Sequence, residues 1–111
     1  MTRTVPKPGR PVRGSTTGRP VMALIDLIGR RWLLRVVWEL RGPPLTFRAL
    51  QSACGDVSPS VLNQRLGELR ASALIELQAE GYQLTALGRE LLALLLPLMR
   101  WADKWAKAVA D

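Results

Sequence analysis

A change in hydrophobic period near residue 74 constrains the fold of this chain more than any other feature. Up to about residue 72, apolar residues recur every three or four positions, as they do on one face of an α-helix. From Ile75 to Leu84 they alternate with polar residues instead, and Ala79-Glu80-Gly81 interrupts the alternation as a turn would. Helical spacing returns after Thr85. The pattern therefore predicts a mostly α-helical domain that contains one short β-hairpin.

Four helices are expected before the hairpin, because each is marked by start or stop signals. Pro20 suits a first helical turn, Thr46 is an N-cap, and Ser58-Pro59 combines an N-cap with proline at the first position. Gly42-Pro43-Pro44 is a hard stop. The expected helices run from Pro20 to Gly29, from about Arg30 to Arg41, from Thr46 to Gly55, and from Ser58 to about Ser72.

The third and fourth helices, joined by the short turn Gly55-Asp56-Val57, form a helix-turn-helix. A two-stranded hairpin directly after the second of these helices is typical of the winged form. The fold class predicted is therefore mostly α (α+β): a winged helix-turn-helix with a short β-hairpin wing and a long C-terminal helix, which we expect to be a dimerisation helix. Residues 20–111 form this domain.

Residues 1–19 differ in composition from the rest of the chain. Five of the 16 Lys and Arg residues lie there, and none of the 9 acidic residues does. The segment is rich in Pro and Gly and poor in large apolar side chains, so it cannot offset the entropy of ordering and is expected to be disordered. Two interpretations stay open: a solubilising leader, or a flexible cationic arm that contacts phosphates.

The residue types that are missing exclude most catalytic chemistry. The 111-residue chain contains no histidine and a single cysteine, Cys54. These counts exclude a His-based triad, a His general base, an intrachain disulfide and nearly every transition-metal catalytic site. No phosphate loop or paired carboxylates appear either. We therefore expect no enzymatic activity, no cofactor and no metal.

The same sequence argues against a membrane protein. The longest apolar run, Leu91 to Met99, is interrupted by Pro97, whereas a membrane span needs roughly 18 apolar residues. The first 19 residues contain no apolar stretch of the kind a secretory signal needs. We expect a cytoplasmic protein with no membrane partner.

Four segments resemble one bacterial protein family. Arg19-Pro20-Val21 and Leu27-Ile28-Gly29-Arg30-Arg31-Trp32 resemble its Cys-Pro-Val and Ile-Gly-Gly-Lys-Trp. The run from Ser58 to Leu69 is similar to its Ser-Pro-Lys-x-Leu-x-x-Arg-Leu-x-x-Leu, and Leu84 to Leu91 to its Leu-Thr-x-x-Gly-x-x-Leu; Trp101 matches a tryptophan of its last helix. Over about residues 19–106, the chain resembles the HxlR family of winged helix-turn-helix transcription regulators. The resemblance implies a homodimer that binds palindromic promoter DNA, and in some members a sensing cysteine.

Three departures from the family pattern qualify that resemblance. Arg19 replaces the family's cysteine before Pro-Val, so thiol sensing by that residue is lost. The wing is short and acidic: it carries Glu76 and Glu80, and no Lys or Arg occurs from residue 71 to 88. Arg31 replaces the family's lysine before tryptophan, which still allows a phosphate contact.

The expected DNA-binding residues lie on the fourth helix and at helix ends. If Leu62, Leu66 and Leu69 face the core, the opposite side presents polar residues that can reach base edges. Asn and Gln pair with adenine, while Arg pairs with guanine or grips phosphate. The alternative is an ordinary solvated face. The set predicted to bind double-stranded DNA is Ser58, Ser60, Asn63, Gln64, Arg65, Arg48, Arg30 and Arg31.

The last helix is apolar on nearly its whole circumference, so one side should meet a second subunit. Isologous pairing is the commonest solution, and it would place two recognition helices about one DNA turn apart. The expected homodimer interface consists of Val21, Met22, Ile25, Leu91, Leu95, Leu98, Trp101 and Trp105.

The four tryptophans allow two interpretations. They are packing residues, or Trp32, Trp38 and Trp101 line a pocket at the dimer interface for a planar apolar effector. Cys54 is interpreted as a small buried residue. The alternative to a DNA-binding regulator is a dimeric protein-interaction or small-molecule-binding module on a winged-helix scaffold, which the acidic wing favours.

Overall fold

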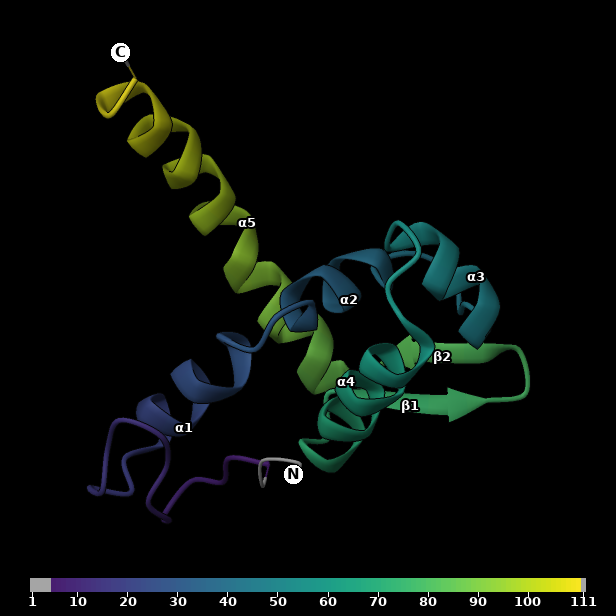
Figure 1. The fold of residues 1–111 in the computed structure, drawn as a ribbon, viewed down its shortest axis with the longest axis horizontal. Helices are drawn as coiled ribbons and strands as arrows, with labels where there is room; N and C mark the ends of the chain where they lie inside the picture. Colours follow the sequence, from purple (N-terminus) through teal and green to yellow (C-terminus); the bar gives the residue numbers. More distant parts are fainter. Residues whose placement is uncertain (1–4, 111) are drawn as a thin grey trace.

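The computed structural model describes residues 5–110, which form five helices and one hairpin (Figure 1). The order is α1 (Pro20–Ile28), α2 (Leu33–Glu39), α3 (Phe47–Ala53), α4 (Pro59–Ala71), β1 (Ile75–Gln78), β2 (Gly81–Leu84) and α5 (Ala86–Ala108). This order confirms the mostly helical architecture with a hairpin between the fourth and the last helix. Within the described residues, no helix is long and apolar enough to cross a membrane.

Three helices begin where their capping residues predict. The backbone N–H groups of Ala49, Val61 and Gly88 donate to the side-chain oxygens of Thr46, Ser58 and Thr85, respectively. Each cap satisfies a donor that has no partner inside its own helix. The starts of α3, α4 and α5 are therefore set by local sequence, and the predicted starts are confirmed.

The second helix is shorter than expected at its beginning. It starts at Leu33 and not near Arg30, because Trp32 adopts a left-handed conformation with φ 75°. A helix cannot continue through such a residue, since positive φ reverses the local sense of the backbone. The chain therefore makes a turn between α1 and α2, and this turn directs the Arg30 side chain inward.

The core is built around α2 and α4. Leu33, Val36, Val37 and Leu40 are completely buried, and they meet the predicted apolar face of α4. That face, Leu62, Leu66 and Leu69, is buried as expected. The two helices thus form the central layer against which α1, α3, the hairpin and the first turns of α5 pack.

The hairpin is attached to the rest of the domain through Leu45. Its antiparallel register pairs Ile75 with Leu84 and Leu77 with Tyr82. Tyr82 also exchanges backbone hydrogen bonds with Leu45, 2.8 and 3.0 Å long. Gly81, predicted as part of the turn, is the first residue of β2. A Cβ atom on it would lie 2.4 Å from the Leu45 carbonyl oxygen, so this close approach requires glycine.

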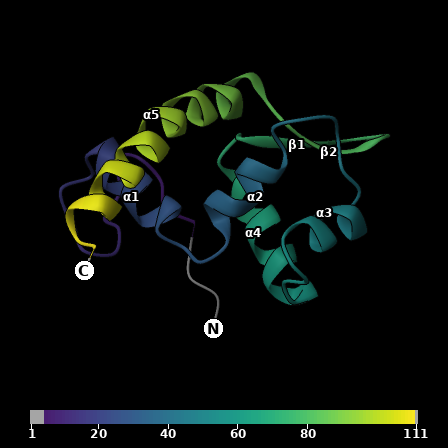
Figure 2. The ribbon, with the colours of Figure 1, turned by 90° about the horizontal axis from the view of Figure 1, so that it is seen from above.

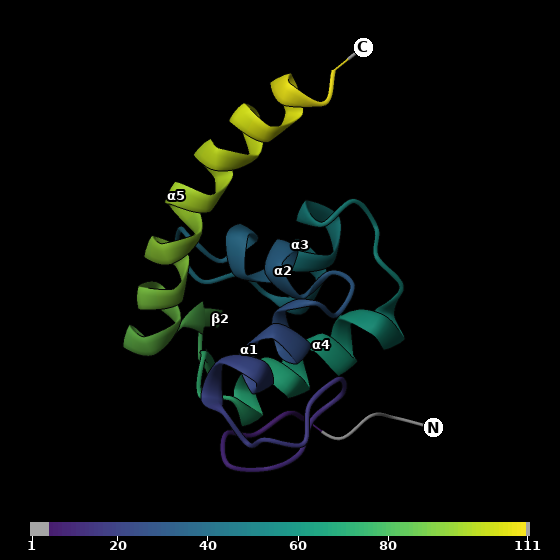
Figure 3. The same ribbon diagram turned by 90° about the vertical axis from the view of Figure 1, so that its left-hand side faces the viewer.

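The last helix belongs to the core only in its first half. Leu91 and Leu95 are buried against the domain, whereas every residue from 96 to 110 is exposed. The helix continues through Pro97, and its second half extends away from the body (Figures 1 and 3). Leu91 and Leu95 are therefore core residues, which corrects their assignment to a dimer interface.

The described part of the N-terminal segment is a loop that lies beside α1 (Figures 1 and 3). It contains a turn closed by Val12 and Ser15, and the Gly9 N–H donates to the Gly18 carbonyl. Pro6 is buried, which composition alone did not predict. Residues 1–4 of the predicted tail lie outside the described residues. The disorder of this segment and the domain boundary at residue 20 stay predictions.

Candidate nucleic-acid interface

The helix-turn-helix unit is stabilised by hydrogen bonds across its turn. Gly55 and Asp56 both have positive φ, 75° and 62°, which reverses the chain within two residues. The Gln51 side-chain amide donates to the Val57 carbonyl over 2.9 Å, and the Asp56 N–H donates to the Gln51 carbonyl over 3.0 Å. These bonds define the angle at which α4 leaves α3.

One face of α4 presents small and amide side chains. Ser60 and Asn63 are exposed, and Gln64 is half-buried beside them. Ser58 is also exposed, but its hydroxyl accepts the Val61 N–H as the helix cap. The accessible surface in the first two turns of α4 is therefore uncharged, able to donate and accept hydrogen bonds, and open to close approach.

Arg65 was predicted to bind DNA, but its guanidinium is bonded within the domain. Its Nε donates to the Arg31 carbonyl over 2.7 Å, and its Nη1 contacts Glu68 Oε1 at 2.8 Å. Its side chain is only 13% exposed. These contacts direct Arg65 toward the chain between α1 and α2, so it does not belong to the open polar face of α4.

Arg30 was expected to contact phosphate, and this expectation is wrong. Its side chain is 2% exposed and forms ion pairs with Glu68 and, at 3.8 Å, with Asp26. Its partner Glu68 is buried as well. Helical spacing could not find this cluster, because the residues of α1 and of the following turn bury that side of α4.

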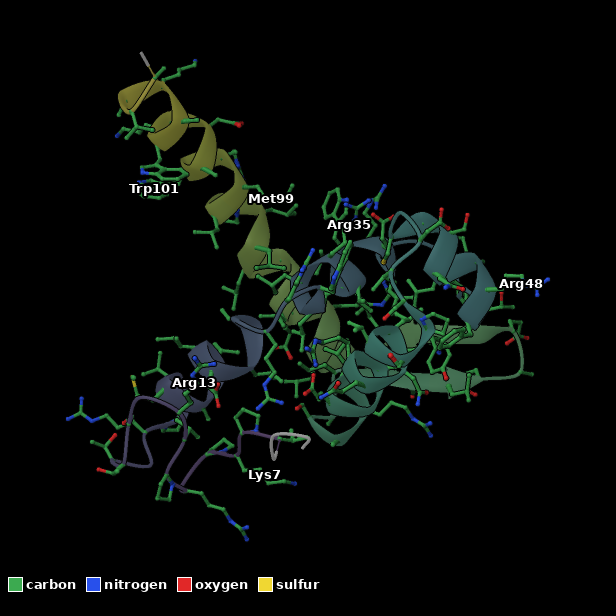
Figure 4. The ribbon with its side chains drawn as sticks, viewed as in Figure 1. Lys7, Arg13, Arg35, Arg48, Met99 and Trp101 are labelled. Atoms are coloured by element: carbon green, nitrogen blue, oxygen red, sulfur yellow. The ribbon has the colours of Figure 1, made fainter. Side chains whose placement is uncertain are left out.

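Two of the cations predicted to contact phosphate, Arg31 and Arg48, are exposed, as is Arg70 at the end of α4. The Arg31 carbonyl accepts a hydrogen bond from Arg65 of α4, and the Arg31 guanidinium lies 5.5 Å from the centroid of the Trp32 ring. Arg48 extends outward from α3 at the edge of the molecule (Figure 4). These guanidinium groups are therefore accessible from outside the domain.

The wing carries no positive charge to complement them. Glu76 accepts a hydrogen bond from the Gln83 side-chain amide over 2.7 Å, and Glu80 is exposed at the tip. A strand of phosphates would be repelled here, so charge attraction has to come from other parts of the molecule.

The three tryptophans predicted to share a pocket do not meet. Trp101 stacks on Trp105 along the exposed half of α5, with ring centroids 6.5 Å apart. Trp38 instead lines an apolar pocket of about 350 Å³ between α2 and α5, together with Leu34, Arg35, Leu95, Leu98, Met99 and Ala102. Trp32 and Trp101 lie outside this lining, so the three tryptophans do not share this pocket within one chain, and a shared pocket at a dimer interface stays a prediction.

The residues expected at a dimer interface divide into two groups. Leu91 and Leu95 are buried in the core, as described above. Val21, Ile25, Leu98, Trp101 and Trp105 are each more than half exposed, and Met22 is half-buried. Sequence reasoning missed Leu94, which is 70% exposed. Its position could have been found from the stripe Leu94, Leu98, Trp101 and Trp105, whose spacing of four, three and four residues keeps one helix face.

Cys54 is buried at the C-terminal end of α3, as predicted. Burial raises the pKa of its thiol, and the nearby Glu39 carboxylate raises it further, while Arg35 acts in the opposite direction. Within residues 5–110, no cluster of three or more His, Cys, Asp or Glu residues could hold a metal ion.

Comparison with known proteins agrees with this geometry. A family model described as HxlR-like helix-turn-helix matches residues 27–110. An HTH-type transcriptional regulator of Methanocaldococcus jannaschii is 28% identical over 92 residues, covering 78% of this chain and 86% of that protein. The HTH-type transcriptional regulator YodB of Bacillus subtilis is 26% identical over 101 residues, covering 85% of this chain and 90% of YodB. The crystal structure of quinone-bound YodB matches with a TM-score of 0.72 and 28% identity, over 76% of this chain and 96% of that one.

Proposed function

This chain belongs to the HxlR-like helix-turn-helix family, and from that premise we propose that it works as a homodimer reading palindromic operator DNA through α4. The family consists of DNA-binding transcriptional regulators, so the predicted class is confirmed and the chain is not an enzyme. We also propose that the protein acts in the cytoplasm, and we assign below the residues that bind DNA and the surfaces through which two copies assemble.

The observation that carries the proposal is the open amide face of α4. Asn63 and Gln64 are accessible on a helix that is capped at Ser58 and follows a tight turn. Asn and Gln side chains can pair with the N6 and N7 atoms of adenine in the major groove. Ser60 is small enough to let the backbone approach the bases. We assign base contacts to these three residues and phosphate contacts to Arg31 and Arg48.

The exposed apolar surface supports assembly through α1 and α5. Trp101 and Trp105 are 56% and 54% exposed, and Val21 and Ile25 on α1 are exposed to a similar extent. Monomeric proteins rarely expose large contiguous apolar patches. Both helices project on the side opposite to α3 and the wing (Figures 1 and 2). A two-fold axis there would leave both copies of α4 free for DNA, in half-sites about one helical turn apart.

We also propose that a planar apolar effector binds in the pocket beside Trp38. The pocket beside Trp38 is apolar and holds one cation, Arg35, at its edge. YodB has been crystallised with a quinone bound. We expect ligands of this shape, such as a quinone analogue, to quench Trp38 fluorescence in a protein whose other three tryptophans are replaced by Phe. The same single-tryptophan protein with Met99→Glu, which places a charge in the pocket lining, should lose the quenching, and unchanged quenching would contradict the assignment.

Selection of bound sequences from random double-stranded DNA tests the proposal directly. The expected result is a palindrome whose half-sites contain adenine at the positions facing Asn63 and Gln64. Binding with no preferred sequence would contradict base reading by α4, and a single unpaired half-site would contradict the dimer.

A further inference from the structure

Four charged side chains form a buried cluster between α1 and the inner side of α4. Asp26 lies in α1, Arg30 follows it in the turn, and Arg65 and Glu68 lie in α4. Their side chains are 8%, 2%, 13% and 4% exposed, respectively. We call this set the buried charge cluster. Its central member is Glu68, which binds Arg30 through one carboxylate oxygen and Arg65 through the other.

The cluster joins α1 to α4 at a place where apolar packing between them is incomplete. A pocket of about 430 Å³ lies between Ala23, Leu24 and Leu27 of α1 and residues 71–74 at the end of α4, and residues 6–8 of the N-terminal segment also line it. Arg30, which follows α1, binds both Asp26 and Glu68. The ion pairs restrict the relative orientation of the two helices, because their donors and acceptors must align. Loose apolar contact across a pocket imposes no such restriction.

The charges of the cluster balance, which explains how it can be buried. Two arginines face one aspartate and one glutamate, so no net charge is removed from water. Buried ion pairs contribute little net stability compared with apolar residues of similar volume. Their documented use is to specify one register among several packings of similar stability. The cluster is therefore better suited to selecting one orientation than to stabilising the domain.

We propose that the buried charge cluster sets the angle between α1 and α4, and through it the spacing of the two half-sites that the dimer accepts. The inference rests on the proposed function, because α1 carries exposed residues of the proposed dimer surface and α4 reads the bases. One base pair is about 3.4 Å along the DNA axis. A small rotation of α4 relative to α1 moves the two recognition helices by that much. Arg30 and Glu68 are positioning residues that do not touch DNA.

The test removes the link to α1 and leaves the internal pair of α4 intact. The variant Asp26→Asn/Arg30→Met deletes one negative and one positive charge, while Arg65 and Glu68 remain paired. The matched control is Glu39→Gln/Arg41→Met. Arg41 Nη1 lies 3.9 Å from Glu39 Oε1, and this pair involves neither α1 nor α4. Both doubles keep the net charge of the protein.

Binding is measured on the selected palindrome with its spacer unchanged, shortened by one base pair or lengthened by one. Wild type and control should each lose about tenfold or more in affinity for the altered spacers, a cost comparable to that of a mismatch. The cluster variant should discriminate by less than about threefold, with its base preference in an isolated half-site unchanged. A merely structural role would weaken all three spacers equally.

A cluster variant that keeps the wild-type spacer preference overturns the inference and leaves the proposed function intact. If the double variant does not fold, Arg30→Lys gives the same test, since lysine keeps the charge but lacks the planar fork of arginine. Its spacer discrimination should also fall, and an unchanged profile in folded Arg30→Lys contradicts the inference. A wild-type protein that selects no paired half-sites instead overturns the proposed dimeric function.

Discussion

At the scale of residues, the two kinds of proposed DNA contact come from different elements. The exposed face of α4 carries the amides of Asn63 and Gln64, while Arg65 is bonded inside the domain. In the proposed mode of binding, base discrimination depends on hydrogen bonds from these two amides. Phosphate attraction depends there on Arg31 and Arg48, which are exposed outside α4.

We expect Asn63→Ala and Gln64→Ala to relax sequence preference, and Arg31→Ala to weaken binding to every sequence alike. Removal of one base-reading side chain should cost about 1–3 kcal/mol of discrimination, and removal of the phosphate-binding Arg31 should reduce the salt slope by about 1. Competition binding with the operator and a scrambled duplex measures both effects. Unchanged discrimination in both α4 variants would show that this face does not read bases.

Cys54 should not respond to oxidants. Its pKa is raised by burial, so less of the reactive thiolate is present at neutral pH than in a free cysteine. Arg19 occupies the position of the cysteine in the family motif, so no second thiol is available there. Diamide should leave operator affinity unchanged, and iodoacetamide should label the native protein more slowly than the unfolded one. Release of the wild type by diamide, without release of Cys54→Ala, would contradict this.

At the scale of elements, the second half of α5 has two distinct faces. Leu94, Leu98, Trp101 and Trp105 share one stripe, and Arg100, Asp103 and Lys107 occupy the opposite side. An amphipathic helix that projects from its own domain (Figure 3) needs another apolar surface to cover that stripe.

We expect Leu94→Glu/Leu98→Glu to yield monomers, because two charges would be buried at the proposed interface. Leu95 is unsuitable for this test, since it is a core residue of the same chain. Ala93→Glu is the control: it adds a charge to an exposed position on the polar side of α5. Sedimentation at micromolar concentration distinguishes the states. A monomeric wild type would overturn the dimer.

The N-terminal segment is expected to supply affinity without specificity. Lys7 and Arg13 (labelled in Figure 4) are exposed on it, as are Arg10 and Arg19, and the wing contains no Lys or Arg. Deleting residues 2–18 should weaken operator and random DNA by similar factors. It should also reduce the log–log salt slope by about 0.9 for each phosphate that the segment neutralises. The fold should survive, since the core cluster contains no residue of this segment. Unchanged affinity and slope would identify the segment as a leader only.

At the scale of the whole molecule, the surfaces proposed to read bases and to form the dimer lie apart, and the buried charge cluster joins α1 to α4 between them. The recognition helix and α3 form one side, and α1 with the projecting half of α5 forms the other (Figure 2). The stability of the domain should therefore be sensitive to any change that leaves one charge of the cluster without its counterpart.

Glu68→Gln should destabilise the folded domain by about 3–5 kcal/mol, because it leaves Arg30 and Arg65 facing a single carboxylate, Asp26. The melting temperature should fall by at least roughly 10 °C. Glu39→Gln is the control, since its partner Arg35 is half exposed and such pairs contribute about 1 kcal/mol or less. Thermal unfolding followed by circular dichroism measures both. Equal losses in the two variants would contradict the importance assigned to the cluster.

Local features of the sequence were sufficient to predict the order of the helices and strands and the residues at which most of them begin. Thr46, Ser58 and Thr85 cap helices through bonds to residues three positions ahead, so these starts depend on neighbours in the chain. The hairpin followed from its period of two, and the buried face of α4 from its period of 3.6. The amide face of α4 was predictable for the same reason.

Tertiary structure decided which faces are covered, because burial depends on the elements that pack against a face and not on its own spacing. Periodicity could not show that Arg30 turns inward to Glu68, since the two are 38 residues apart. The left-handed Trp32 that delays α2 is likewise tolerated only in the packed domain. On α5, one apolar surface became core at Leu91 and Leu95 and stayed exposed beyond residue 95, because the rest of the domain ends there.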